Sequence, residues 1–131
     1  MTDAEAPTGA DDGPVPRVLC HTESLAAEPA GTGALWRLAE PGRQLDANLV
    51  RVPPHGHIGT HREPDLDVLL LVVAGDGTLG SAPGPQRLTP GSLVWLPHGS
   101  ARSLTAGEDG LSYVTVHRRR AGLWIGTRPD G

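Results

Sequence analysis

The sequence has no phenylalanine, one tyrosine and a single cysteine, Cys20, among its 131 residues. One cysteine excludes an intramolecular disulfide and a cysteine-based zinc site, so we expect Cys20 to be a small buried apolar residue. Without phenylalanine, the core must be filled by leucine, valine and three tryptophans. No apolar run approaches the ~20 residues that span a bilayer, and the polar N-terminus lacks the pattern of a signal peptide. We therefore expect a cytoplasmic protein with no membrane partner.

Positive charge is also scarce, and the formal net charge is −4. Residues 1–16 account for this value, because they carry Asp3, Glu5, Asp11 and Asp12 and no arginine or lysine. The rest of the chain is close to neutral and has no clustered basic excess, which argues against a nucleic-acid partner. We interpret the one basic run, 118–120, as a solvated strand end or as a partner for carboxylates. A phosphate-binding patch is the alternative.

Glycine and proline are abundant, at 18 and 13 residues. Residues 1–16 are rich in Ala, Asp, Gly and Pro and have almost nothing to bury, so we expect a disordered N-terminal tail. Residues 17–131 are expected to form a single domain. A short helical turn over 21–29 is expected, with Thr22 as its N-cap. Beyond it, no segment shows an apolar stripe at helical spacing, and the frequent turns favour strands.

The strand candidates follow one another closely and predict an all-β sandwich, jelly roll or barrel. Turns are expected at 41–42, 76–78 and 106–110. The run over 67–75 is continuously apolar, so both of its faces are expected to be buried. The predicted strands are 34–40, 44–52, 67–75, 91–97, 111–118 and 122–126.

The stretch "GSLVWLPHGSAR" carries a recognisable spacing. Gly91 is followed by five residues, then Pro97, one residue, Gly99 and two further residues. This spacing resembles the second motif of the cupin superfamily, which ends in a histidine. Arg102 stands at that last position.

The stretch "HGHIGTHREPDLDVLLLVVAG" is loosely similar to the first cupin motif. His61 resembles its first histidine, Glu63 falls on the second, and Asp67 lies one residue before the expected glutamate. Gly75 fits the closing glycine. The resemblance, which covers about residues 35–118, implies a double-stranded β-helix, the cupin jelly-roll barrel. It also implies a homodimer, because cupins often dimerise.

In a typical cupin the four matching positions hold three histidines and one glutamate that bind iron, manganese, nickel or zinc. Arginine has no acceptor lone pair and remains protonated, so Arg102 cannot be a metal ligand. We expect its planar guanidinium to replace the metal and to pair with Glu63 or Asp67. The predicted function is the binding of a small polar or anionic molecule in the barrel. The expected ligand-binding residues are His61, Glu63, Asp67 and Arg102, with no cofactor.

Two other functions stay open. A non-standard site for a divalent metal, built from His57, His61, Glu63 and Asp67, would support a metal-dependent dioxygenase, isomerase or lyase. Without a metal, His61 with either carboxylate could act as an acid/base pair. A scaffold protein that dimerises through its sheet edges is the non-catalytic alternative. The remaining polar and aromatic candidates are expected on surface loops (His21, His98, His117) and in the core or a subunit interface (Trp36, Trp95, Tyr113, Trp124).

Overall fold

The computed structural model describes residues 14–28 and 31–120. They form one short helix and seven strands, so the all-β prediction is confirmed. Most of the predicted tail and the predicted strand at 122–126, with Trp124, lie outside the described residues. The elements are α1 (Thr22–Ala26), β1 (Gly33–Arg37), β2 (Leu45–Val52), β3 (His57–Arg62), β4 (Val68–Gly80), β5 (Gln86–Leu88), β6 (Leu93–Leu96) and β7 (Ala101–Arg118).

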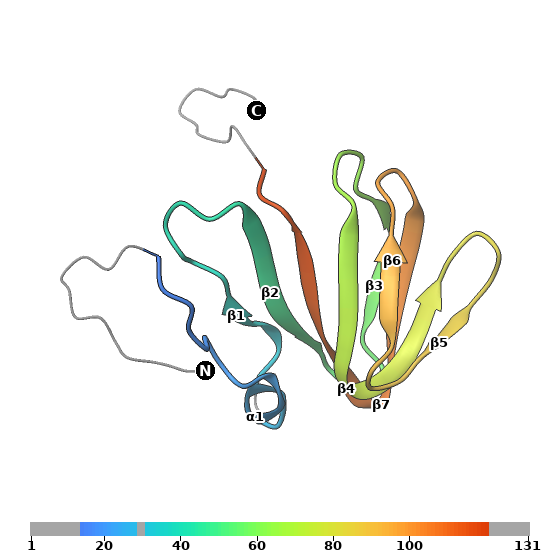
Figure 1. Ribbon diagram of the computed structural model, residues 1–131. Helices are drawn as coiled ribbons and strands as arrows, with labels where there is room; N and C mark the ends of the chain where they lie inside the picture. The colour runs from blue at the N-terminus through green and yellow to red at the C-terminus, as the bar shows by residue number, and fades with distance from the viewer. Residues whose placement is uncertain (1–13, 29–30, 121–131) are drawn as a thin grey trace.

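The strands form one antiparallel sheet with the order β1-β2-β7-β4-β5, in which β3 also pairs with β7 and β6 with β4. The long strand β7 takes part in both halves of this sheet. Its residues 111–118 pair with β2, and its residues 101–105 pair with β3. The sheet therefore opens into two arms that join near the bends of β4 and β7 (Figure 1).

The expected turns at 76–78 and 106–110 are wrong, because β4 and β7 continue through both segments. These strands bend at irregularities in their ladder, between Val72 and Ala74 and between Gly75 and Gly77. Gly75 has φ +76°, and a Cβ there would lie 2.0 Å from the carbonyl oxygen of Gly110. Two long strands can thus cross closely and bend where the sequence suggests hairpins.

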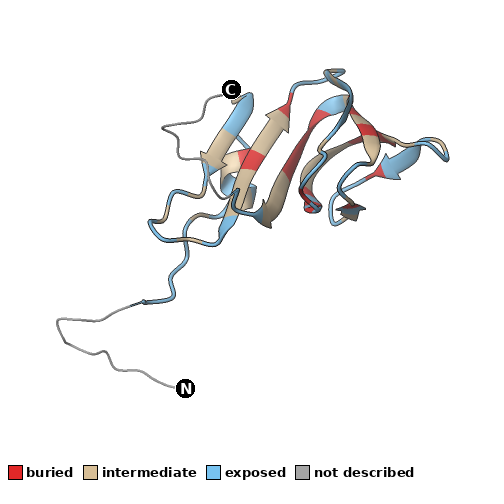
Figure 2. Ribbon diagram, turned by 90° about the horizontal axis from the view of Figure 1, so that it is seen from above, coloured by how far each residue is buried: buried red, intermediate tan, exposed pale blue. Residues whose placement is uncertain are grey.

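The core is built mainly from residues of β4 and β7, with single residues from β2, β5 and β6, and buried positions (red) occur on several strands of the sheet (Figure 2). Val68, Leu70 and Val72 of β4 are buried, whereas Leu69 and Leu71 are 43% and 39% exposed. The prediction that both faces of this strand are buried is therefore wrong within one chain. The run alternates as a half-buried strand does, and its outer face is also apolar.

The expected helical turn is present, but it begins at Thr22 and its N-cap position is His21, which makes no side-chain capping bond. Cys20 is half-buried. Trp95 is 58% exposed, whereas Tyr113 is 5% exposed and belongs to the core. No helix among the described residues is long and apolar enough to cross a membrane.

Candidate functional site

The barrel holds a cavity of about 270 Å³ lined by β3, β4, β6, β7 and the chain that follows β3 and β7. Its lining falls into a buried group, the cavity wall, and a less buried group, the cavity rim. The cavity wall consists of Leu66, Val68, Leu70, Leu79, Leu96, Arg102, Leu104 and Tyr113. The cavity rim consists of Ile58, His61, Arg62, Glu63, Thr115, His117 and Arg120.

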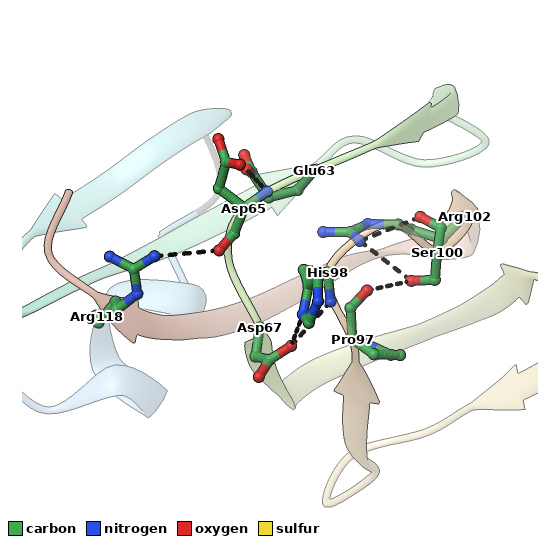
Figure 3. Close-up of polar contacts among 8 residues, drawn as sticks. All are labelled: Glu63, Asp65, Asp67, Pro97, His98, Ser100, Arg102 and Arg118. Atoms are coloured by element: carbon green, nitrogen blue, oxygen red, sulfur yellow. Dashed lines mark hydrogen bonds and ion pairs between the residues drawn. The ribbon is translucent and has the colours of Figure 1, made fainter.

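Arg102 is the charged member of the cavity wall, and only 7% of its surface is exposed. It lies near the start of β7, directly after the turn that contains Pro97. Its Nη1 donates to the carbonyl oxygen and to the hydroxyl of Ser100, both at 3.3 Å. The Ser100 hydroxyl in turn donates to the carbonyl oxygen of Pro97 at 2.7 Å. The turn thus fixes one nitrogen of the guanidinium (Figure 3).

The expected pairing of Arg102 with Glu63 or Asp67 is not present. Within residues 14–28 and 31–120, no carboxylate forms an ion pair with Arg102. Glu63 pairs instead with Arg120, and Asp67 pairs with His98. The physical reason is that both carboxylates have nearer partners, so no carboxylate of the described chain pairs directly with the buried guanidinium.

Glu63 belongs to the cavity rim and is held by two donors. The backbone N–H of Asp65 donates to its Oε2 at 2.9 Å, and Nη2 of Arg120 donates to its Oε1 at 2.6 Å. The Asp65 hydrogen bond lowers the pKa of Glu63 most, and burial opposes it as the second-largest effect. The Arg120 bond and the charges of Arg120 and Arg102 lower the pKa further. Glu63 is therefore an ionised carboxylate. Its interaction with Arg102 is electrostatic and involves no hydrogen bond between them.

Asp67 does not line the cavity. Its Oδ1 accepts hydrogen bonds from the backbone N–H of His98 at 2.9 Å and contacts the Nδ1 of that histidine at 2.8 Å. These contacts lower the pKa of Asp67, with the side-chain bond as the first cause. In addition, the N–H of Gly99 donates to the carbonyl oxygen of Glu63 at 2.7 Å. Asp67 and His98 therefore fasten the segment after β3 to the turn after β6 (Figure 3).

The two candidate histidines of β3 lie differently. His61 belongs to the cavity rim and stands opposite Arg102 in the β3–β7 ladder. His57 is exposed and outside the cavity lining, and its Nδ1 contacts the hydroxyl of Thr105 at 2.8 Å. The expected set of four is thus divided: His61, Glu63 and Arg102 line the cavity, and Asp67 does not.

The non-standard metal site is not assembled. Among the residues that the structure describes, no group of three or more histidine, cysteine, aspartate or glutamate side chains is placed to hold a metal ion. His57 and Asp67 are bonded away from the cavity. Arg102 lines the same cavity as the remaining donors, His61 and Glu63, and adds a fixed positive charge. The donor set therefore does not fit a divalent cation.

Five polar or charged residues of the cavity lining were not among the predicted site residues: Tyr113, Thr115, His117, Arg120 and Arg62. The first three alternate along β7, as residues on one face of a strand do. That alternation is visible in the sequence, but it also describes an ordinary core strand. Burial raises the pKa of the Tyr113 hydroxyl. The pairing of Arg120 with Glu63 agrees with the interpretation of the basic run as a partner for carboxylates.

The cavity is electropositive although the whole chain is acidic. Three arginines and one carboxylate line it, namely Arg62, Arg102, Arg120 and Glu63, so the formal charge of the lining is +2. The whole chain carries −4. The lining therefore combines an aliphatic wall with a local excess of positive charge, an arrangement that can attract and hold an anion.

No protein-family model matches the sequence, and no curated protein matches it. Several solved structures, however, align with the chain. A protein from Bacillus halodurans aligns with a TM-score of 0.65 at 20% identity over 92% of this chain and 89% of its own. A cupin-2 domain containing protein from Shewanella frigidimarina aligns with a TM-score of 0.62 at 16% identity, over 78% and 95%.

A sugar phosphate isomerase from a cupin superfamily, from Silicibacter pomeroyi, aligns with a TM-score of 0.53 at 20% identity over 60% of this chain. The match spans about half of that protein, 52%. The architecture shared with these structures is an antiparallel barrel of the double-stranded β-helix type. The chain has the cupin fold, as the two sequence motifs predict.

Proposed function

We propose that this cupin-fold protein binds a small carboxylate or similar anion in its cavity, with Arg102 as the anchor. The observation that carries the proposal is a buried guanidinium without a carboxylate partner among the described residues. Buried charges in proteins are normally paired, and a lone one is costly. An anion entering from solvent would supply the missing charge and would accept a bidentate pair of hydrogen bonds from the planar fork.

The neighbours of Arg102 support this role. In the described structure only its Nη1 is bonded, to Ser100, which leaves Nε and Nη2 for a ligand. Glu63 is already bonded to Asp65 and Arg120, so a ligand carboxylate need not displace it. His61, opposite Arg102 in the ladder, offers a further polar contact at the rim.

The test is a thermal-shift titration of the protein with small carboxylates, in parallel with Arg102→Met. Wild-type protein should unfold at higher temperature as the carboxylate concentration rises, because a ligand at 100 times its dissociation constant adds ~2.7 kcal/mol. Arg102→Met should show no such shift.

The matched control is Arg87→Met. Arg87 is an exposed arginine that pairs with Asp76 outside this cavity. This variant should respond to carboxylates as the wild type does. Equal shifts in wild type and Arg102→Met would exclude Arg102 as the anchor.

A further inference from the structure

We infer that the ligand is an amphiphilic monocarboxylate with a short, unhydroxylated hydrocarbon body, as opposed to a sugar acid or another polyhydroxylated anion. The inference rests on the proposed function, because it takes Arg102 as the carboxylate anchor. It adds what the part of the ligand against the cavity wall must be, and it follows from the scarcity of polar groups in that wall.

The cavity wall offers very few polar partners. Its eight residues include six aliphatic side chains, each at most 7% exposed. Arg102 and Tyr113 are the polar members. Hydroxyl groups pressed against the aliphatic residues would lose their hydrogen bonds to water without replacement. A hydrocarbon body would instead remove apolar surface of both partners from water.

Tyr113 provides one polar contact besides Arg102. Its hydroxyl has no hydrogen-bond partner among the described side chains, and Ser112 Oγ is the only polar side-chain atom there that is both fully buried and unpaired. The Tyr113 hydroxyl therefore keeps access to the cavity that its side chain lines. One hydroxyl can serve the second carboxylate oxygen or a single further polar atom. The other polar residues of the lining, namely His61, Arg62, Glu63, Thr115, His117 and Arg120, lie at the cavity rim, so the cavity wall itself has no partners for several hydroxyl groups.

The size of the cavity limits the hydrocarbon body. A volume of about 270 Å³ accommodates a ligand on the order of ten non-hydrogen atoms, judged from the volume that a water molecule takes up. Hexanoate fits this size. Threonate, a hydroxylated acid of nearly the same size, serves as its polar counterpart. Hexanamide retains the hydrocarbon body and lacks the charge.

The experiment is isothermal titration calorimetry of the wild-type full chain with acetate, butanoate, hexanoate, threonate and hexanamide. Each buried methylene should raise the affinity about fourfold, so hexanoate should bind about fifteenfold more tightly than butanoate. Threonate should bind at least tenfold more weakly than hexanoate, because its hydroxyls meet the aliphatic wall. Hexanamide should not bind measurably.

Two substitutions test whether the hydrocarbon body of the ligand lies in this cavity. Ile58→Asn places a polar group at the half-buried aliphatic position of the cavity rim, and it should weaken hexanoate while leaving acetate unchanged. Val94→Asn is the matched control, because Val94 is a half-buried residue packed against the same core but outside this cavity. It should change neither affinity.

These titrations distinguish a ligand without a hydrocarbon body from the absence of anion binding at Arg102. If the three alkanoates bind equally, or threonate binds as tightly as hexanoate, while binding still requires Arg102, the hydrocarbon body is refuted and anion binding stands. If no carboxylate binds at all, the proposed function fails as well. Since the series uses the wild-type protein, poor folding of a variant does not obscure the result.

Discussion

At position 102 a guanidinium is buried with hydrogen bonds to Ser100 and no ion pair within the described chain. Removing a buried charge that has no direct ion-pair partner relieves the cost of its desolvation. Arg102→Met should therefore raise the free energy of unfolding in carboxylate-free buffer by about 1 kcal/mol or more. Urea denaturation measures this change. The same variant that loses the ligand should thus gain stability.

Arg102→Lys is the control for this prediction. It retains the charge and loses the planar fork, so it should not gain stability. A loss of more than about 1 kcal/mol in Arg102→Met, the size of a hydrogen-bond contribution, would contradict the prediction. In that case the guanidinium would act mainly as a structural partner of Ser100.

Single residues of the site were predictable only where a motif fixes their spacing. The Gly91–Pro97–Gly99 frame identifies Arg102 because the turn and the strand after it have a set geometry. The first motif fits loosely, and there a shift of one residue turns a side chain to the other side. Asp67 was therefore assigned to the cavity although it bonds to His98 outside it.

At the scale of elements, Asp67 and His98 connect the segment after β3 with the turn after β6. The hydrogen bonds of His98, and to a lesser extent the charges of His98 and Arg118, lower the pKa of Asp67 below its ordinary value of 3.8. The contact therefore stabilises the fold fully above that ordinary value, and its contribution is lost as the pH falls through the lowered pKa.

Asp67→Asn should accordingly be less stable than the wild type at neutral pH, and the difference should shrink below pH 3.8. Urea denaturation of both proteins across this range measures the difference. Asp65→Asn, in the same loop, should leave the acid dependence unchanged, because the Asp65 contacts in the described structure involve its backbone. A wild-type/Asp67→Asn difference that is constant with pH would contradict the titration of Asp67 as its source.

The ends of strands were less predictable than their existence. Segments rich in glycine and aspartate were interpreted as turns, yet 76–78 and 106–110 lie inside β4 and β7. Glycine permits both a hairpin and a close crossing of strands, and local sequence does not distinguish them. The contact between Gly75 and Gly110 joins residues far apart in the chain, which only the folded barrel specifies.

At the scale of the whole molecule, the outer face of the sheet is apolar over three strands. Leu69 and Leu71 of β4 lie opposite Trp95 and Leu93 of β6, which are 58% and 67% exposed. The row continues onto β7 through valines paired with the same β4 residues. This row faces away from the cavity wall, because neighbouring residues of a strand point to opposite sides.

We propose that a second copy of the chain covers this apolar row, which would bury both faces of β4 in a homodimer and leave the cavity to the ligand. An exposed row of leucine and tryptophan is typical of an interface between subunits. Trp95→Glu should therefore halve the mass measured by light scattering after size-exclusion chromatography. Val18→Glu, at a 74% exposed apolar position outside the row, should not alter it. A wild-type protein that is monomeric at every concentration would refute the homodimer, and because the cavity faces the other way, it would leave anion binding at Arg102 intact.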